Sequence, residues 1–136
     1  MILCDQASKF FVALYLNEHE SLTVVPKYFR FTLVRNEGGA LGFLKGQRVL
    51  FIIISVIFIS VLSFILIDGK DLSRALAYGL VFIIAGACGN MLDRIVRKSG
   101  VVDFIDITLF KRNLPVANIA DLSLLSGMII LIVGLV

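Results

Sequence analysis

The chain has 136 residues, of which 59% are hydrophobic, and its mean hydropathy is +0.99. This composition excludes an ordinary soluble domain and indicates a membrane protein. The formal net charge of +3 is small, and the basic residues are scattered among apolar ones, so nothing favours nucleic-acid binding. Cys4 and Cys88 lie in apolar surroundings without CxxC spacing, which favours buried small hydrophobes over a disulfide or a metal pair.

The first segment, residues 1–16, is apolar but carries Asp5 and Lys9. It is too short and too charged to span a bilayer alone, so we expect the outer part of a helix whose first turns are missing. It lacks the basic region and the cleavage site of a signal peptide. Asp5 and Lys9 stand at i and i+4 with the acid first, the favourable order for a helical ion pair. A structural pair and a catalytic role both explain this spacing.

The next stretch changes to a period of two. Phe29, Phe31 and Leu33 alternate with other side chains, which is typical of a strand with one apolar face. A glycine-rich turn follows Asn36 and begins at Gly38, where backbone can approach a ligand closely. An interfacial hairpin that lies on lipid headgroups explains the same pattern.

Three long apolar segments complete the chain. Residues 49–67 contain no charge, and a helix of this length covers the bilayer core of about 30 Å. Residues 75–92 are equally uncharged and contain three glycines, which let membrane helices approach closely. Residues 122–136 are apolar throughout and lack a basic stop, so we expect the natural chain to continue. The prediction is four transmembrane helices; the positive-inside rule alone would place the first and third loops in the cytoplasm.

Polar residues recur at the end of the third span and at the start of the fourth. Asn90, Asp93 and Arg94 occupy positions i, i+3 and i+4, so they lie on one face of the third helix. Asn118 and Asp121 repeat the Asn-x-x-Asp spacing where the fourth helix begins. Such residues commonly cap helix ends. They are also functional candidates, because a charge within the membrane is costly.

Three acids converge if the third and fourth helices are antiparallel neighbours. The loop between these helices carries VVDFIDI, with Asp103 and Asp106. Asp93, Asp103 and Asp121 then gather at one membrane surface. A small proton-coupled membrane transporter is an alternative, although a proton relay needs acids spread through the depth of the bilayer. A non-catalytic membrane scaffold is a third interpretation.

The residue types limit the chemistry of this cluster. A zinc protease of the HExxH kind needs two histidines, and the chain has one, His19, in a polar stretch that indicates a solvated loop. A Ser–His pair is disfavoured for the same reason, and Ser8 and Lys9 are neighbours on a helix that point apart. Two carboxylates without a metal remain. Held close together they cannot both ionise, so one keeps a proton while the other accepts one from water.

Five short motifs in order carry a resemblance to a known family. They are DQASK at 5–9, NEGGALG at 36–42, GNMLDR at 89–94, VVDF at 101–104 and NIAD at 118–121. With these motifs the chain resembles the lipoprotein signal peptidases, signal peptidase II, along nearly its whole length. The resemblance implies an aspartyl endopeptidase that removes signal peptides from diacylglyceryl-modified bacterial prolipoproteins. It cleaves before the lipidated cysteine and uses no metal or other cofactor.

The resemblance also implies an architecture and a location. It implies a single membrane-embedded peptidase domain over residues 1–136, with an incomplete first helix and C-terminal tail. The fold is an all-α integral membrane protein of four transmembrane helices, with a small extracytoplasmic β-rich cradle and flap between helices 1 and 2. The protein would cross the bacterial cytoplasmic (inner) membrane several times as a monomer, with its active site near the extracytoplasmic face. This implied orientation replaces the one that the positive-inside rule alone would give. Its expected partners are prolipoproteins, membrane lipid and a globomycin-type inhibitor, and no nucleic acid.

Finally, the resemblance assigns roles to residues of the motifs. It makes Asp103 and Asp121 the catalytic dyad. Asp93 is expected to hold the end of the third helix, and Asp106, which matches no motif, is expected to be a turn or surface acid. The residues implied to bind substrate or support the site are Asp5, Lys9, Asn36, Gly38, Asn90, Asp93, Arg94 and Asn118.

Overall fold

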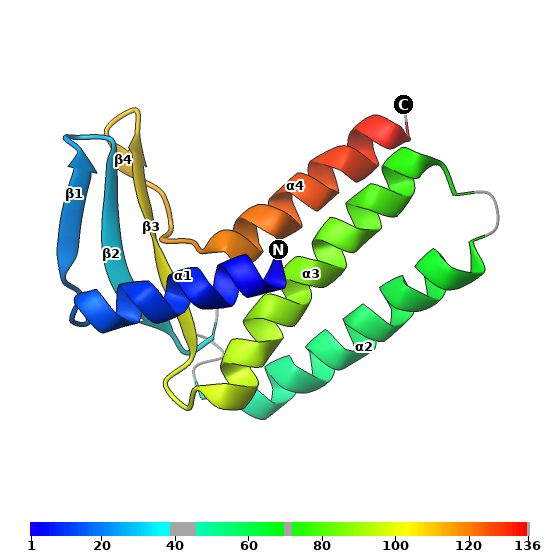
Figure 1. Cartoon of the computed structure of the whole chain (residues 1–136), viewed down its shortest axis with the longest axis horizontal. Helices are drawn as coiled ribbons and strands as arrows, with labels where there is room; N and C mark the ends of the chain where they lie inside the picture. Colours follow the sequence, from blue (N-terminus) through cyan, green and yellow to red (C-terminus); the bar gives the residue numbers. More distant parts are fainter. Residues whose placement is uncertain (39–45, 70–71, 136) are drawn as a thin grey trace.

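The structure is a computed structural model that describes residues 1–38, 46–69 and 72–135. Most of the predicted glycine-rich flap, from residue 39 onward, lies outside the described residues. Within the described ranges the chain forms four helices and four strands (Figure 1). In chain order these are α1 (Ile2–Tyr15), β1 (Ser21–Val25), β2 (Phe29–Asn36), α2 (Arg48–Asp68), α3 (Arg74–Val96), β3 (Val101–Leu109), β4 (Arg112–Asn113) and α4 (Ile119–Gly134).

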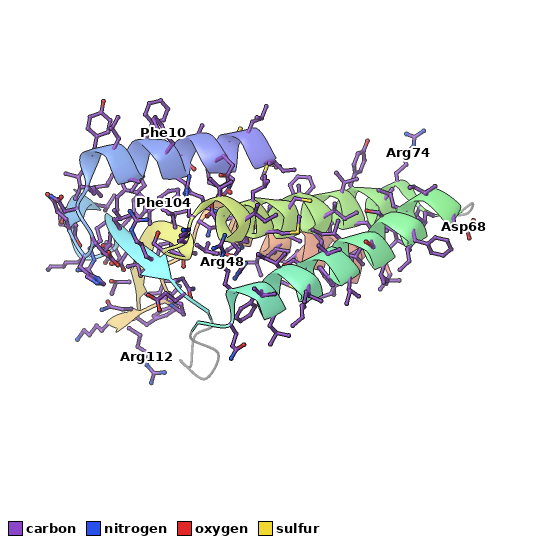
Figure 2. All side chains as sticks on the ribbon, turned by 90° about the horizontal axis from the view of Figure 1, so that it is seen from below. Phe10, Arg48, Asp68, Arg74, Phe104 and Arg112 are labelled. Atoms are coloured by element: carbon purple, nitrogen blue, oxygen red, sulfur yellow. The ribbon has the colours of Figure 1, made fainter. Side chains whose placement is uncertain are left out.

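Helices α2, α3 and α4 lie side by side, and the sheet stands at one end of them beside α1 (Figure 1). In the described part of the chain, α2 and α3 are long and apolar enough to cross a membrane. They coincide with the uncharged segments predicted to span it. Helix α1 has 14 residues and α4 has 16, so each is shorter than a usual span. No residue of α2 is buried, and many of its large apolar side chains are exposed, as expected of a surface that faces lipid (Figure 2).

Glycine allows α3 and α4 to pack closely. A Cβ atom on Gly86 of α3 would lie 2.4 Å from the carbonyl oxygen of Ala120 in α4. Further along the same pair of helices, a Cβ atom on Gly127 would lie 2.7 Å from the carbonyl oxygen of Gly79. No side chain fits at such distances, so the predicted role of the glycines as close-approach residues is confirmed for this helix pair.

The four strands form one antiparallel arrangement in the order β1–β2–β3–β4. The prediction of a β-rich element between the first two helices is right for β1 and β2 but incomplete, because β3 and β4 come from the segment between α3 and α4. VVDFIDI was expected in a loop and instead forms β3 from its first residue, Val101, to Ile107. Its β-branched residues favour a strand, and β2 supplies the partner, pairing Phe29 with Ile107 and Asn36 with Val101.

Strands β2 and β3 bury apolar residues against α1. Leu33, Val102 and Phe104 form a buried cluster, and Val12 of α1 and the C-cap residue Leu16 pack on it. Phe104 lies beneath α1, whereas Phe10 is on the opposite side of that helix (Figure 2). The apolar alternation in residues 29–33 therefore marks a real strand. This packing fixes the strand that carries Asp103 against the helices.

Candidate active site

The site lies where β3, the end of α3 and the start of α4 meet. Asp103 comes from β3, and Asp121 comes from the first turn of α4. Asn118 is the N-cap of α4: its side-chain oxygen accepts the N–H of Asp121 at 2.9 Å, and the Asp121 carboxylate accepts the N–H of Asn118 at 3.1 Å. This reciprocal cap holds one candidate acid at the helix start.

Three asparagine amides donate hydrogen bonds to the two acids. Asn118 Nδ2 donates to Asp103 Oδ1 at 2.6 Å, and Asn36 Nδ2 donates to Asp103 Oδ2 at 3.1 Å. Asn90 Nδ2 donates to Asp121 Oδ1 at 2.8 Å. Asn118 Nδ2 also donates to Asn90 Oδ1 at 3.1 Å, so the network runs unbroken from one acid to the other. The structure thus brings together Asp103, Asp121 and all three predicted asparagines.

The carbonyl side of each amide has its own donor. The backbone N–H of Gly38, a residue with φ of +140°, donates to Asn36 Oδ1 at 3.2 Å. The N–H of Asp121 donates to Asn118 Oδ1, as described above. Lys9 Nζ donates to Asn90 Oδ1 at 3.2 Å. Each amide is therefore oriented with its NH₂ group toward the acids.

A buried ion cluster of Asp5, Lys9 and Asp93, from α1 and α3, lies next to the site. Lys9 Nζ lies 2.8 Å from Asp5 Oδ2 and 2.9 Å from Asp93 Oδ2, so the predicted helical ion pair forms and a second acid joins it. Asp5 Oδ1 also accepts the N–H of Ala120 at 2.8 Å, which joins α1 to the first turn of α4. Asp93 Oδ2 accepts the N–H of Val102 at 3.2 Å, which joins α3 to β3. Asp93 thus connects α1, α3 and β3 through its side chain.

The environment of Asp103 favours its protonated form. The residue is 3% exposed and lies outside the membrane-spanning segments. Burial raises the pKa of Asp103 to about 6, and the negative charge of Asp121 acts in the same direction. The hydrogen bonds from Asn36 and Asn118 and the positive charge of Lys9 oppose this rise. At a pH near 6 the protonated and ionised forms of the Asp103 carboxyl are therefore about equally populated.

Arg94 and Arg48 form the cationic side of the site. Arg94 donates to the carbonyl oxygen of Asn90 at 3.0 Å and lies over the ring of Phe51, 4.9 Å from its centroid. Arg48, at the start of α2 (Figure 2), donates to the carbonyl oxygens of Arg94 and Ile95, the latter at 2.7 Å. A cavity of about 310 Å³ opens beside these residues and is lined by Asn36, Glu37, Gly46, Arg48, Arg94, Lys98 and Gly100.

The expectation for Asp106 is wrong. Asp106 is not a surface acid: it is 4% exposed, and it pairs with Arg30 Nε at 2.5 Å and with Thr32 Oγ1 at 2.8 Å. The reason is register, because Arg30 on β2 stands directly opposite Asp106 on β3.

The expectation that both cysteines are buried holds only in part. Cys88 is half-buried but Cys4 is exposed, and both are free.

Sequence reasoning missed two residues of the site. Gln6 Nε2 lies within 3.1 Å of both Asp5 Oδ2 and Asp93 Oδ1, and its place inside the DQASK motif was the available signal. Arg48 had no signal in the sequence, because its partners are backbone carbonyls of another helix.

Within the described ranges, no group of three or more His, Cys, Asp or Glu side chains is placed to hold a metal ion.

Comparison with known proteins places this fold among bacterial membrane enzymes. Two solved structures described as bacterial membrane enzymes match with a TM-score of 0.89 and 35% identity. The matches cover 98% and 99% of this chain and 81% and 86% of those chains. Lipoprotein signal peptidases of Staphylococcus aureus strains RF122 and JH9 are 34% and 35% identical over 135 residues, which is 99% of this chain and 82% of each relative.

The family follows from a full-length match. The family model described as signal peptidase (SPase) II matches residues 1–136, and the chain belongs to this family. Members of this family are proteases that remove signal peptides from prolipoproteins, and the prediction of this function from the five motifs is confirmed. The alternative of a proton-coupled transporter has no support among the relatives.

Proposed function

We propose that the chain is an aspartic endopeptidase whose catalytic dyad is Asp103 and Asp121. One observation carries the proposal: an unbroken network of three amides links these two carboxylates and orients every NH₂ group toward them. Two acids held in this way divide the roles of proton donor and proton acceptor, as in other aspartic proteases.

The surroundings of the two acids suggest which role each one takes. Asp103 has a pKa raised to about 6 by burial, so it is the acid that keeps the shared proton. Asp121 stands in the first turn of α4, where its carboxylate accepts the N–H of Asn118. Asp121 is therefore the base in the resting dyad, although the proton belongs to the coupled pair.

The reaction follows from this division. Asp121 takes a proton from water, and the oxygen of that water attacks the scissile carbonyl carbon while Asp103 gives its proton to the carbonyl oxygen. The resulting tetrahedral diol collapses when Asp103 takes a hydroxyl proton back. Asp121 delivers its proton to the leaving amine, and the C–N bond breaks. Both acids end as they began, and one water has been added across the peptide bond.

The proposed substrate is a diacylglyceryl-modified prolipoprotein, cut before the lipidated cysteine. The outward apolar side chains of α2 allow the acyl chains to stay in lipid while the peptide enters the cavity lined by Arg48 and Arg94. Binding energy from the acyl chains then orients the scissile bond at the dyad. Arg94, Asn36 and Gly38 are assigned to this substrate-binding side of the site. A globomycin-type inhibitor would occupy the same cavity.

The proposed location is the bacterial cytoplasmic membrane, with the dyad near its extracytoplasmic face. Helices α2 and α3 cross the membrane, and α1 and α4 are proposed to complete four crossings of a single monomeric domain with lipid around it. Asp5, Lys9 and Asp93 hold three of these helices together, since they join α1 to α3 and α4, and they also connect to β3.

The test is cleavage of a diacylglyceryl-modified precursor peptide by the purified chain in lipid nanodiscs. Asp103→Asn and Asp121→Asn should each lower kcat by about 10³-fold or more, because each removes one half of the acid–base pair. Globomycin should block the wild type. Unfolding temperatures close to that of the wild type will show that both variants fold. Near-normal turnover by either folded variant overturns the dyad.

A further inference from the structure

The three amides of the site differ in what holds their carbonyl oxygens. The donors for Asn36 and Asn118 are backbone N–H groups two and three residues along the chain, so those amides are oriented by local turns. Asn90 is different. Its carbonyl oxygen takes its N–H groups from Asn118 and from Lys9, which is 81 residues away on α1. The orientation of Asn90 therefore depends on another helix.

The ammonium group of Lys9 is buried and has an acceptor for each of its N–H donors. Its side chain is fully buried, and its ammonium group has three N–H donors. Three acceptors surround it: Asp5 Oδ2 at 2.8 Å, Asp93 Oδ2 at 2.9 Å and Asn90 Oδ1 at 3.2 Å. Two carboxylates already compensate the charge of Lys9. The contact with Asn90 thus goes beyond what charge pairing requires.

The ammonium allows only one orientation of the Asn90 amide. In the observed orientation the carbonyl oxygen faces Lys9, and Nδ2 donates to Asp121 Oδ1 at 2.8 Å. A flipped amide would turn its NH₂ group toward the ammonium and its oxygen toward the carboxylate, so both contacts would become repulsive. Charge-assisted hydrogen bonds of this kind are the stronger ones. Lys9 acts on Asp121 through a single intervening side chain.

We propose that Lys9 is a positioning residue for the peptidase reaction, because its ammonium fixes the Asn90 amide in the orientation that holds the Asp121 carboxylate for catalysis. This inference rests on the proposed dyad. Losing the ammonium should lower kcat more than it changes KM, because Lys9 acts on the dyad and not on the substrate. The charged groups that interact with Asp103 are Lys9 of α1, Arg94 of α3 and Asp121 of α4.

The experiment uses charge-neutral double variants. Asp93 loses Lys9 in them but keeps Arg97 as a cation, with Nη1 3.3 Å from Asp93 Oδ1. Asp5→Asn with Lys9→Met removes the ion pair but keeps an oxygen to accept the N–H of Ala120. Asp5→Asn with Lys9→Gln returns an N–H donor toward Asn90 without the charge. The matched control, Asp106→Asn with Arg30→Met, removes a buried ion pair from the sheet instead. All are assayed in nanodiscs beside Asp103→Asn, and their unfolding temperatures are measured.

The Met variant should lose about 10- to 100-fold in kcat, the usual effect of a misplaced catalytic group, with KM within about threefold. Lys9 lowers the pKa of Asp103, so the decline of kcat/KM at high pH should move to higher pH in this variant. The Gln variant should recover most of the kcat but keep the shifted decline. The control variant should change neither kcat nor the pH at which kcat/KM declines.

Two outcomes overturn the inference: a folded Met variant with kcat within about threefold of the wild type, or a loss of kcat in the Gln variant as large as in the Met variant. If the Met variant does not fold, the Gln variant alone decides, and a loss of kcat of about tenfold or more in the folded Gln variant contradicts the inference. Activity in Asp103→Asn would instead overturn the dyad, so the two failures are distinguishable.

Discussion

The two halves of β3 each carry one buried acid, and the two acids differ in the charge of their partners. Asp103 and Asp106 are 3% and 4% exposed and stand three residues apart on one strand. Asp106 pairs with the guanidinium of Arg30, which compensates its charge. Among the described residues, the hydrogen bonds to the Asp103 carboxylate come from the neutral amides of Asn36 and Asn118, and the negative charge of Asp121 also acts on it. The two buried carboxylates therefore differ in their direct partners: a cation pairs with Asp106, whereas amide groups donate to Asp103.

The largest expected effect separates these two acids directly. Asp103→Asn should lower kcat/KM by about 10³-fold, because it removes a proton donor, whereas Asp106→Asn should stay within about threefold of the wild type. Both changes are isosteric and lie on the same strand, so each is the control for the other. Cleavage of the lipid-modified precursor gives both numbers, and equal losses in the two variants would remove the distinction.

The second effect concerns stability. Arg30→Met leaves Asp106 buried without its cation and should lower the free energy of unfolding by about 1–3 kcal/mol. The Arg30 side chain is 42% exposed, which keeps the cost at the low end for a buried pair. Thermal unfolding in detergent measures the loss, and activity per folded molecule should be unchanged. An unfolding temperature equal to that of the wild type would show that Arg30 does not compensate Asp106.

The third effect is a change in pH dependence. The active dyad carries one proton, so kcat/KM should fall as the pH rises through the Asp103 pKa of about 6. The hydrogen bond from Asn36 lowers this pKa, so Asn36→Ala should raise it and move the fall to higher pH. Arg30→Met should leave the pH profile in place. A shift to lower pH in Asn36→Ala contradicts the assigned role of this amide.

The smallest expected effect is that of a chelator. EDTA should leave the cleavage rate of the wild type unchanged within error, because the proposed mechanism activates water with Asp121 alone. The control is the same assay with added magnesium or zinc after chelation. A strong loss with EDTA that returns with added metal would replace the dyad by a metal mechanism.

Part of this fold was predictable because the signals are local. Uninterrupted apolar runs predict α2 and α3, and the alternation from Phe29 to Leu33 predicts β2. The convergence of Asp103 and Asp121 followed from treating α3 and α4 as antiparallel neighbours. These patterns depend on residues within one element or on one simple packing rule, so no distant contact had to be known.

The rest depends on distant contacts that no local pattern encodes. The pairing of Asp106 with Arg30 joins residues 76 positions apart, and the contact of Lys9 with Asn90 joins residues 81 positions apart. The aspartates inside VVDFIDI obscured a strand, because their burial requires partners on β2 and α4. Motif resemblance named Lys9 as a supporting residue. The three acceptors around its ammonium, and therefore its effect on Asn90, required the structure.

The central claim is that Asp103 holds the proton shared by the dyad, and infrared titration tests it most directly. The wild type in nanodiscs should lose a protonated carboxyl band with a midpoint near pH 6, the raised pKa of Asp103. The band should be absent from Asp103→Asn and present in Asp106→Asn. A band near this pH that survives in Asp103→Asn, or disappears in Asp106→Asn, would contradict the account.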